Sequence, residues 1–229
     1  MDKIKEIIGI LEREYGPRRW RPHRDPISEL ILAVLSQNTS DVNTARAFSS
    51  LITYFNSWEE VASGDEERIA AAIRCGGLSR IKAARIKEIL RQIIEERGSL
   101  NLDFLRDLPL PEAKAWLQKL PGVGPKTASC VLLFSLGMPA LPVDTHLHRV
   151  ARRLGLIDSK VSAEKAHEIL EKLVPPEDIY GFHLNVIEHG RKVCRSRKPL
   201  CFKCILRERC VYGAEIEGGI NAEDQGRDH

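Results

Sequence analysis

The sequence of 229 residues lacks any long apolar run. No stretch approaches the ~20 consecutive apolar residues that a helix needs to cross a bilayer, so we expect no association with membranes. A signal peptide is also missing, because the first residues, MDKIKEIIGILERE, are charged and amphipathic. These absences predict a cytoplasmic protein.

Aromatic residues are few, at 6% of the chain, and strand-forming residues do not alternate over long runs. No internal repeat of long period is present. Leu, Ile, Ala, Glu, Lys and Arg dominate, and apolar residues recur at helical spacing, so the sequence predicts an all-α fold. A box of Ser57 and Glu60 is expected to begin one helix, and Asp41 to cap another that runs through Phe55. The other expected helices cover 2–15, 27–35, 66–74, 80–97, 111–120, 125–137, 145–154, 162–173 and 178–191.

Net charge is low, at +3, and does not by itself indicate a nucleic-acid partner. The distribution of charge is more informative. Residues 191–209 contain eight Lys or Arg and one acid, Glu208. Such a basic segment favours an anionic polymer as partner. The tail after Gly213 is acidic and Gly-rich and is expected to be disordered.

Six cysteines in a chain without an export signal favour a metal site over disulfides. Cys75 and Cys130 stand alone in helical sequence and are expected to be buried as small apolar residues. The other four lie in the basic segment with spacings of x6, x2 and x5, at Cys194, Cys201, Cys204 and Cys210. Four thiolates can hold a tetrahedral zinc ion or an iron–sulfur cluster, and their softness permits both.

The string LPGVGPKTA (120–128) predicts a tight hairpin between two helices. Gly122 and Gly124 permit positive φ, Val123 can pack back between the helices, and Pro125 suits the first helical turn. The free N–H groups at that helix end, with Thr127 in its first turn, form a candidate site for DNA phosphates that reads no base. A plain connector between helices is the alternative, and the full string favours phosphate binding.

Two residues near the hairpin are candidates for chemistry. Lys126 stands in the first turn of the predicted helix, where the helix dipole and partial burial disfavour the protonated amine and leave a nucleophile. A charged lysine that binds phosphate is the alternative. Asp144, in PVDTH, begins a later helix and is expected to act as its N-cap. The same carboxylate could also stabilise positive charge on a sugar that loses its base.

LPGVGPKTA, PVDTH, HGRKVC and Cys-x6-Cys-x2-Cys-x5-Cys occur here in one order. The ordered set resembles endonuclease III, a DNA glycosylase with AP-lyase activity in the helix-hairpin-helix superfamily, over residues 1–212. The resemblance implies that Lys126 and Asp144 are catalytic and that the four cysteines hold a [4Fe–4S] cluster. It also implies a six-helix barrel domain at 26–137, with the helix-hairpin-helix at about 111–137. The remaining residues, 1–25 and 138–212, would form an iron–sulfur cluster domain, followed by the tail of 213–229.

The resemblance also indicates residues that contact DNA, together with departures from the family pattern. The family's Leu-Ser-Ala-Gln-Ala-Thr-Asp appears here as LSQNTSD, so Asn38 aligns with the glutamine that fills the gap left by a flipped base. Gln37 could still serve with a small shift. Leu78 is retained as the wedge on the opposite strand, whereas Ser79 and Arg80 replace tyrosine and asparagine. We call residues 194–210, from the first to the last of the four cysteines, the cysteine loop. The phosphate contacts expected there are Arg195, Arg197 and Lys198.

The expected protein is therefore a monomeric, nucleoid-associated base excision repair enzyme. Its partner is double-stranded DNA with a damaged base, for which we expect oxidised pyrimidines, or with an abasic site. Lys126 would displace the base through a Schiff base, and β-elimination would cleave the strand. Two alternatives are a glycosylase of the same superfamily for mismatched or deaminated bases, and a catalytically inactive DNA-binding or redox module.

Overall fold

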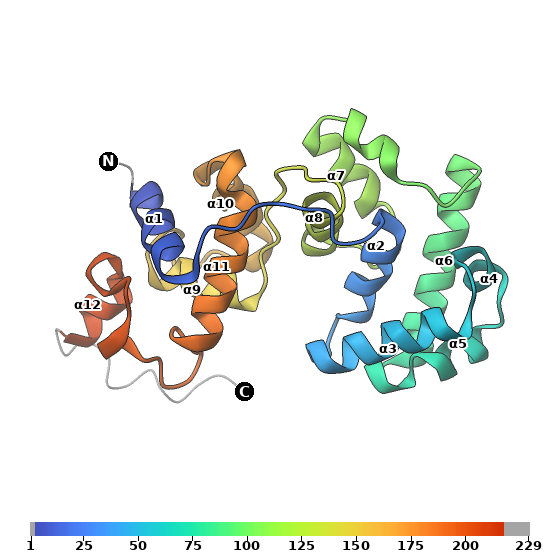
Figure 1. The fold of residues 1–229 in the computed structure, drawn as a ribbon, viewed down its shortest axis with the longest axis horizontal. Helices are drawn as coiled ribbons and strands as arrows, with labels where there is room; N and C mark the ends of the chain where they lie inside the picture. The colour runs from blue at the N-terminus through green and yellow to red at the C-terminus, as the bar shows by residue number, and fades with distance from the viewer. Residues whose placement is uncertain (1–2, 218–229) are drawn as a thin grey trace. The chain divides into compact units, whose positions relative to one another are not determined.

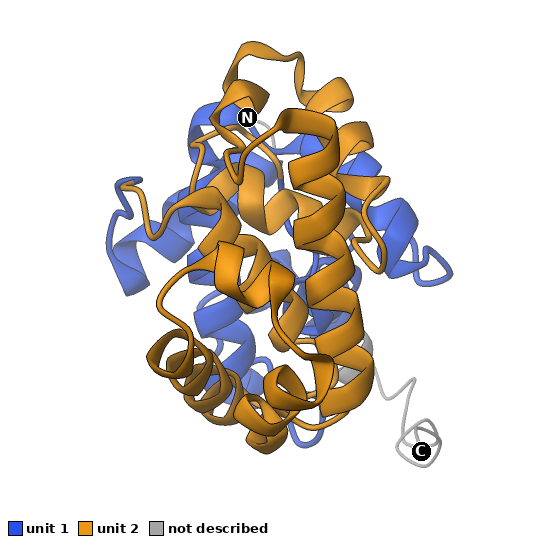
Figure 2. Ribbon diagram, turned by 90° about the vertical axis from the view of Figure 1, so that its right-hand side faces the viewer, with its two compact units in different colours: residues 1–20, 141–229 blue, residues 21–140 orange. Residues whose placement is uncertain are grey.

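Helices account for all the regular secondary structure in residues 3–217, the part of the chain described by the structure, a computed structural model. No β-strand occurs within these residues, which confirms the predicted all-α class. No helix in this range is long and apolar enough to cross a membrane. The chain divides into two compact units, coloured in Figure 2. We call residues 21–140 the hairpin unit, and residues 1–20 with 141–229 the terminal unit.

The hairpin unit packs around a single apolar core. Helix α2 packs against α8 and α3, and the long helix α6 packs against α4 and α5 (Figure 1). Local sequence explains where several helices begin, since Asp25 and Ser57 cap α2 and α4 with their side chains. The elements are α2 (Pro26–Leu35), α3 (Asp41–Tyr54), α4 (Trp58–Ser63), α5 (Glu66–Ala72), η1 (Arg74–Gly76), α6 (Ser79–Arg97), η2 (Asp103–Asp107), α7 (Leu110–Gln118) and α8 (Pro125–Phe134).

The terminal unit brings the first helix of the chain against the last long one. Helix α1 packs on α11, which in turn packs on α9 (Figure 1). Apolar side chains of α1 at helical spacing, such as Ile4, Ile7 and Leu11, form part of its buried core. The elements are α1 (Lys3–Tyr15), α9 (Thr145–Arg153), α10 (Ala163–Leu173), η3 (Pro176–Asp178), α11 (Ile179–Lys192), η4 (Cys201–Lys203), η5 (Arg207–Arg209) and α12 (Val211–Glu217).

Three local expectations need correction. Ser40, not Asp41, is the N-cap of α3, because its hydroxyl accepts from the amide of Asn43 and Asp41 is already helical. Cys75 is exposed, because it lies in the short 3₁₀ turn η1 rather than in a packed helix. Residues 213–217, expected in the disordered tail, belong to α12, whose residue Gly213 is buried. The rest of that tail, 218–229, lies outside the described residues.

Candidate active site and nucleic-acid interface

The predicted hairpin joins α7 to α8. Gly122 has a φ of +71°, in the left-handed region that favours glycine, whereas Gly124 has an extended backbone with φ −91°. Val123 is buried, as predicted, and its amide donates to the carbonyl of Leu120. Pro125 occupies the first turn of α8. The two glycines therefore differ. Gly122 adopts a left-handed conformation that favours glycine, whereas the conformation of Gly124 is open to any residue.

The start of α8 offers unpaired amide groups. The helix has no side-chain cap, and the amides of Lys126 and Thr127 donate to no acceptor in the described part of the chain. A Cβ placed on Gly124 would meet nothing within 4 Å, so the backbone that precedes α8 is uncovered at this glycine. Amides at a helix N-terminus bind anions well, because the partial positive charge of the helix lies there.

Lys126 is exposed, so the expectation of partial burial was wrong. The helix explains this, because Thr127, Ala128 and Ser129 face the packed interior of the unit while position 126 faces outward. Its amine is therefore accessible to a ligand that reaches the hairpin. Thr127 is buried, and its hydroxyl oxygen accepts from Gln37 at 3.4 Å.

The turn between α2 and α3 separates the roles of Gln37 and Asn38. The side-chain amide of Gln37 donates to the carbonyl of Gly122 at 3.0 Å, and its oxygen accepts from Arg85 at 2.8 Å. Gln37 is thus held against the hairpin. Asn38 is exposed and has a φ of +54°, which is uncommon for a residue with a Cβ.

Leu78 precedes α6 and is also in the left-handed region, at φ +50°. The residue is 53% exposed, so its side chain is accessible to a partner. Ile81, in the first turn of α6, is exposed as well. Unfavourable backbone conformations are concentrated at functional sites, so Leu78 is a candidate contact residue.

Asp144 caps α9, as predicted, and lies in the terminal unit. Its Oδ1 accepts from the amide of Leu147 at 2.7 Å. The side chain is partly exposed, so a ligand can reach the carboxylate oxygen that the cap leaves free.

Later turns of α9 hold the cysteine loop. Arg149 donates to the carbonyl of Cys194, and Arg153 donates to the carbonyls of Arg195 and Ser196. One guanidinium nitrogen of Arg153 also lies 3.4 Å from Cys194 Sγ. A single helix therefore carries Asp144 at its start and supports the cysteine loop near its end.

The four cysteine sulfurs influence one another. Burial raises the pKa of the Cys204 thiol to about 11, and the neighbouring sulfurs of Cys194, Cys210 and Cys201 add to the rise. Burial also raises the pKa of Cys201 and of Cys210, again with other cysteines contributing. His189 Nε2 lies 3.6 Å from Cys204 Sγ, and the other ring nitrogen is 2.9 Å from the Tyr15 hydroxyl. Four sulfurs thus gather in one partly buried place.

The donor set fits a [4Fe–4S] cluster. Such a cluster takes one thiolate on each of four irons, so its ligands stand farther apart than the ligands of one ion. The softness of four thiolates is the basis of this fit, since within residues 3–217 no group of three or more His, Cys, Asp or Glu side chains is arranged to hold a metal ion. The residues that could hold the cluster are the four cysteines of the loop.

Cations of the same loop point to solvent. Arg195, Arg197 and Lys198 are exposed, and within the described residues their side chains make no hydrogen bond or ion pair.

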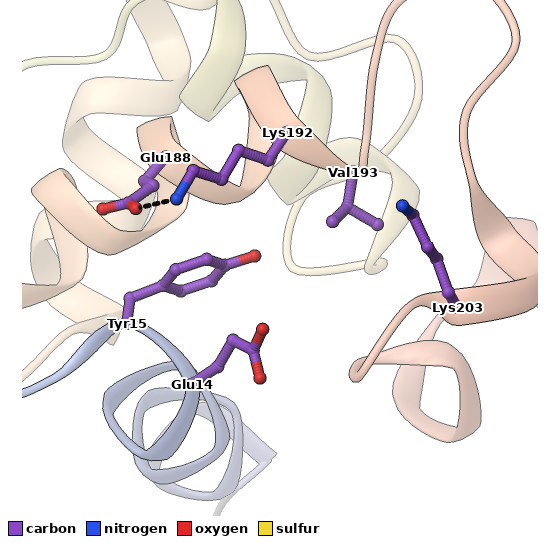
Figure 3. A pocket seen from close by; sticks show the side chains of 6 residues that line it. All are labelled: Glu14, Tyr15, Glu188, Lys192, Val193 and Lys203. Carbon is purple, nitrogen blue, oxygen red and sulfur yellow. Dashed lines mark hydrogen bonds and ion pairs between the residues drawn. The ribbon is translucent and has the colours of Figure 1, made fainter.

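A charged pocket of about 360 Å³ lies nearby, between α1, α11 and the loop (Figure 3). Glu188 pairs with Lys192 there. None of the predicted site residues lines this pocket.

Sequence reasoning missed several residues that support these sites: Lys82, Arg85, Arg149, Arg153 and His189. For Lys82 a signal existed, because it stands four residues before Ile86 on the face of α6 that is buried. A lysine on a core face suggests a buried ammonium with specific partners. The partners of the others come from distant segments, which no local pattern indicates.

Comparison with known proteins gives concordant results. Residues 31–176 match the model of the HhH-GPD superfamily of base excision DNA repair proteins. Endonuclease III of Thermotoga maritima is 39% identical over 209 residues, which cover 90% of this chain and 93% of the relative. Endonuclease III of Escherichia coli K12 is 33% identical, covering 94% of this chain and 97% of the relative.

Solved structures are similar as well. A non-covalent endonuclease III–DNA complex superposes with a TM-score of 0.81 at 28% identity, covering 95% of this chain and 99% of the other. A thermostable thymine-DNA glycosylase superposes with a TM-score of 0.77 at 25% identity, covering 93% and 97%.

Proposed function

Because the chain belongs to the HhH-GPD superfamily of base excision DNA repair proteins and is an endonuclease III-like DNA glycosylase, we propose that it both removes damaged bases and cleaves the DNA strand. The observation that supports this most directly is the position of Lys126. An exposed amine stands in the first helical turn after a hairpin whose amides are free to bind phosphate.

In the proposed reaction, Lys126 Nζ attacks C1′ of the damaged nucleotide and the bond from C1′ to the base breaks, so the base leaves with the electron pair. The amine then loses a proton, and the C1′–O4′ bond breaks as O4′ takes up a proton. The opened sugar stays attached to Lys126 Nζ as a Schiff base. Loss of a proton from C2′ allows the 3′ C–O bond to break, which is β-elimination. Asp144 would act on the same nucleotide, where its negative charge stabilises the cationic sugar in the transition state.

The target base lies inside a duplex, so the nucleotide has to turn out of the stack before Lys126 can reach it. We propose Asn38 as the group that fills the resulting gap, and Leu78 as the wedge beside it. Their exposure supports this, and so does the engagement of Gln37, whose amide already bonds to Gly122 and Arg85. Oxidised pyrimidines are the proposed lesions, because such damage weakens stacking and makes the turning-out easier.

A [4Fe–4S] cluster held by Cys194, Cys201, Cys204 and Cys210 is part of the proposal. When bound, it would supply a cross-link that fixes the conformation of the cysteine loop. Arg195, Arg197 and Lys198 would then bind DNA phosphates. Such contacts neutralise the phosphate charge and do not depend on the base sequence.

A glycosylase for mismatched or deaminated bases remains the second candidate, because the solved thymine-DNA glycosylase is similar over nearly the whole chain. Lys126 opposes it, since a glycosylase that does not cleave the strand needs no amine nucleophile.

Borohydride trapping separates these candidates. The protein is incubated with duplexes that carry an oxidised pyrimidine, uracil, a G·T mismatch, 8-oxoguanine or an abasic site, and covalent complexes are counted. We expect trapping and strand cleavage with the abasic and oxidised-pyrimidine duplexes. Lys126→Gln should abolish both while duplex binding survives, because the hairpin amides and loop cations are intact. A Lys126→Gln protein that traps at the parent rate would show that another amine is the nucleophile.

A further inference from the structure

Lys82 is a buried lysine in helix α6 of the hairpin unit. It is only 2% exposed, and its ammonium donates to two carbonyl oxygens, those of Leu35 at 2.8 Å and Gly76 at 2.9 Å. Leu35 is the last residue of α2, and Gly76 is the last residue of η1. Carbonyls at helix ends lack a partner within the helix and carry partial negative charge, so an ammonium suits both.

The two carbonyls stand at the bases of the two loops discussed above. Leu35 precedes Asn38 by three residues, and Gly76 precedes Leu78 by two. The backbone amide of Lys82 also donates to the carbonyl of Leu78 at 2.9 Å. One residue of α6 therefore bonds to the segment before Asn38, to the segment before Leu78 and to Leu78 itself.

Both loops hold a residue in an unfavourable backbone conformation. Among the described residues that are not glycine, only Asn38, Leu78 and Lys198 have positive φ. Such conformations cost free energy, and they persist only where contacts with the surrounding structure enforce them. Asn38 and Leu78 are also exposed, and Leu78 is held through its backbone carbonyl, which accepts from the amide of Lys82.

Arg85, three residues after Lys82, extends the support to the hairpin. It donates to Gln37, whose amide nitrogen donates in turn to the carbonyl of Gly122 and to the hydroxyl of Thr127. The guanidinium also covers Gly122, since a Cβ there would lie 2.3 Å from Arg85 Nε. The α2–α3 turn is thus fixed to the phosphate-binding hairpin.

We propose that Lys82 and Arg85 are positioning residues, which hold Asn38 and Leu78 as one rigid probe for entry into the duplex. The proposal rests on the proposed function. The ammonium of Lys82 fixes the spacing of the two loops, and Arg85 fixes the α2–α3 turn to the hairpin. Neither side chain touches the reacting atoms. Because the probe is rigid before DNA binds, no ordering of the loops opposes its insertion.

The test compares Lys82→Met with Lys87→Met. Methionine keeps the apolar stem of Lys82 and removes the ammonium, while Lys87 lies on the same helix, is partly exposed and makes no hydrogen bond or ion pair in the described part of the chain. Single-turnover base release is measured on two duplexes, one with the lesion paired and one with the lesion opposite a one-nucleotide gap in the other strand. Base release from the second duplex should depend less on insertion of Asn38 and Leu78, because its lesion is already unpaired.

We expect Lys82→Met to slow release from the paired duplex by about tenfold, which corresponds to about 1.4 kcal/mol in the barrier. The loss on the gapped duplex should be much smaller, and Lys87→Met should match the parent on both. In a Leu78→Ala background, adding Lys82→Met should cost little more, because residues that act through one another are not additive. Arg85→Gln should give the same pattern.

Equal losses on both duplexes, with additive effects, would show that Lys82 only stabilises the fold and would overturn the proposal. Parent-like release by Lys82→Met would also overturn it. If Lys82→Met does not fold, as judged by circular dichroism, the Arg85→Gln variant decides the question on the same criteria. A parent protein that releases no base from any duplex refutes the proposed function instead, and the inference with it.

Discussion

Replacing each hairpin glycine by alanine should separate stability from DNA binding. At Gly122 the φ of +71° is unfavourable for alanine by about 1–2 kcal/mol. The new Cβ would lie 2.3 Å from Arg85 Nε and 2.5 Å from its Cζ, so the guanidinium has to move away from Gln37. Loss of a hydrogen bond to a charged group costs about 1.5–3 kcal/mol.

These effects together should lower the free energy of unfolding by about 2–4 kcal/mol, after the small gain that alanine brings by restricting the unfolded chain. For a chain of this length each kcal/mol lowers Tm by about 2–4 °C, so the Tm of the Gly122→Ala protein should fall by about 4–16 °C.

Gly124→Ala is the matched control. Its φ of −91° suits any residue, and a Cβ there meets nothing within 4 Å. Only the effect on the unfolded chain remains, which stabilises by about 0.4–1 kcal/mol. Binding to an abasic duplex should nevertheless weaken, because the methyl group stands on the open side of the hairpin amides.

Thermal unfolding is followed by far-ultraviolet circular dichroism and by tryptophan fluorescence, since Trp58 and Trp116 both lie in the hairpin unit. Fluorescence anisotropy with a labelled abasic duplex gives the binding. The reasoning is refuted if Gly124→Ala lowers Tm as much as Gly122→Ala does, or if Gly122→Ala leaves Tm unchanged.

The remaining predictions concern the terminal unit. Native protein should contain iron and sulfide with broad visible absorbance, and Cys204→Ser should reduce both; stoichiometric zinc without iron would contradict the cluster. Arg197→Gln should weaken binding to all duplexes alike and reduce the salt slope by ~0.9, whereas a loss confined to one lesion would argue against a phosphate contact. Asp144→Asn should keep the N-cap and hence Tm, yet lower base release by orders of magnitude, with abasic-site cleavage affected less. Equal loss of both activities would point to a structural role for Asp144.

The local sequence determined the helices and their beginnings with good accuracy. Periodicity fixed α1 within a residue at its start, and the cap at Asp144 followed from a residue type whose side chain bonds to the amide three positions on. Errors arose where neighbours competed for one role. Ser40 and Asp41 both suit an N-cap, and only the backbone conformation selected Ser40.

Other features depended on segments that are far apart in the chain. The two hairpin glycines look equivalent in sequence, and the contact of Arg85 with Gly122 distinguishes them. Gln37 and Asn38 are adjacent amides, and a guanidinium 48 residues away engages Gln37 alone. Periodicity reports which face of a helix is buried, but a hydrogen bond between loops depends on where packing brings their backbones. Sequence therefore determined the helices and the chemistry-bearing residue types, while tertiary packing decided which of those side chains are held and which are exposed to a ligand.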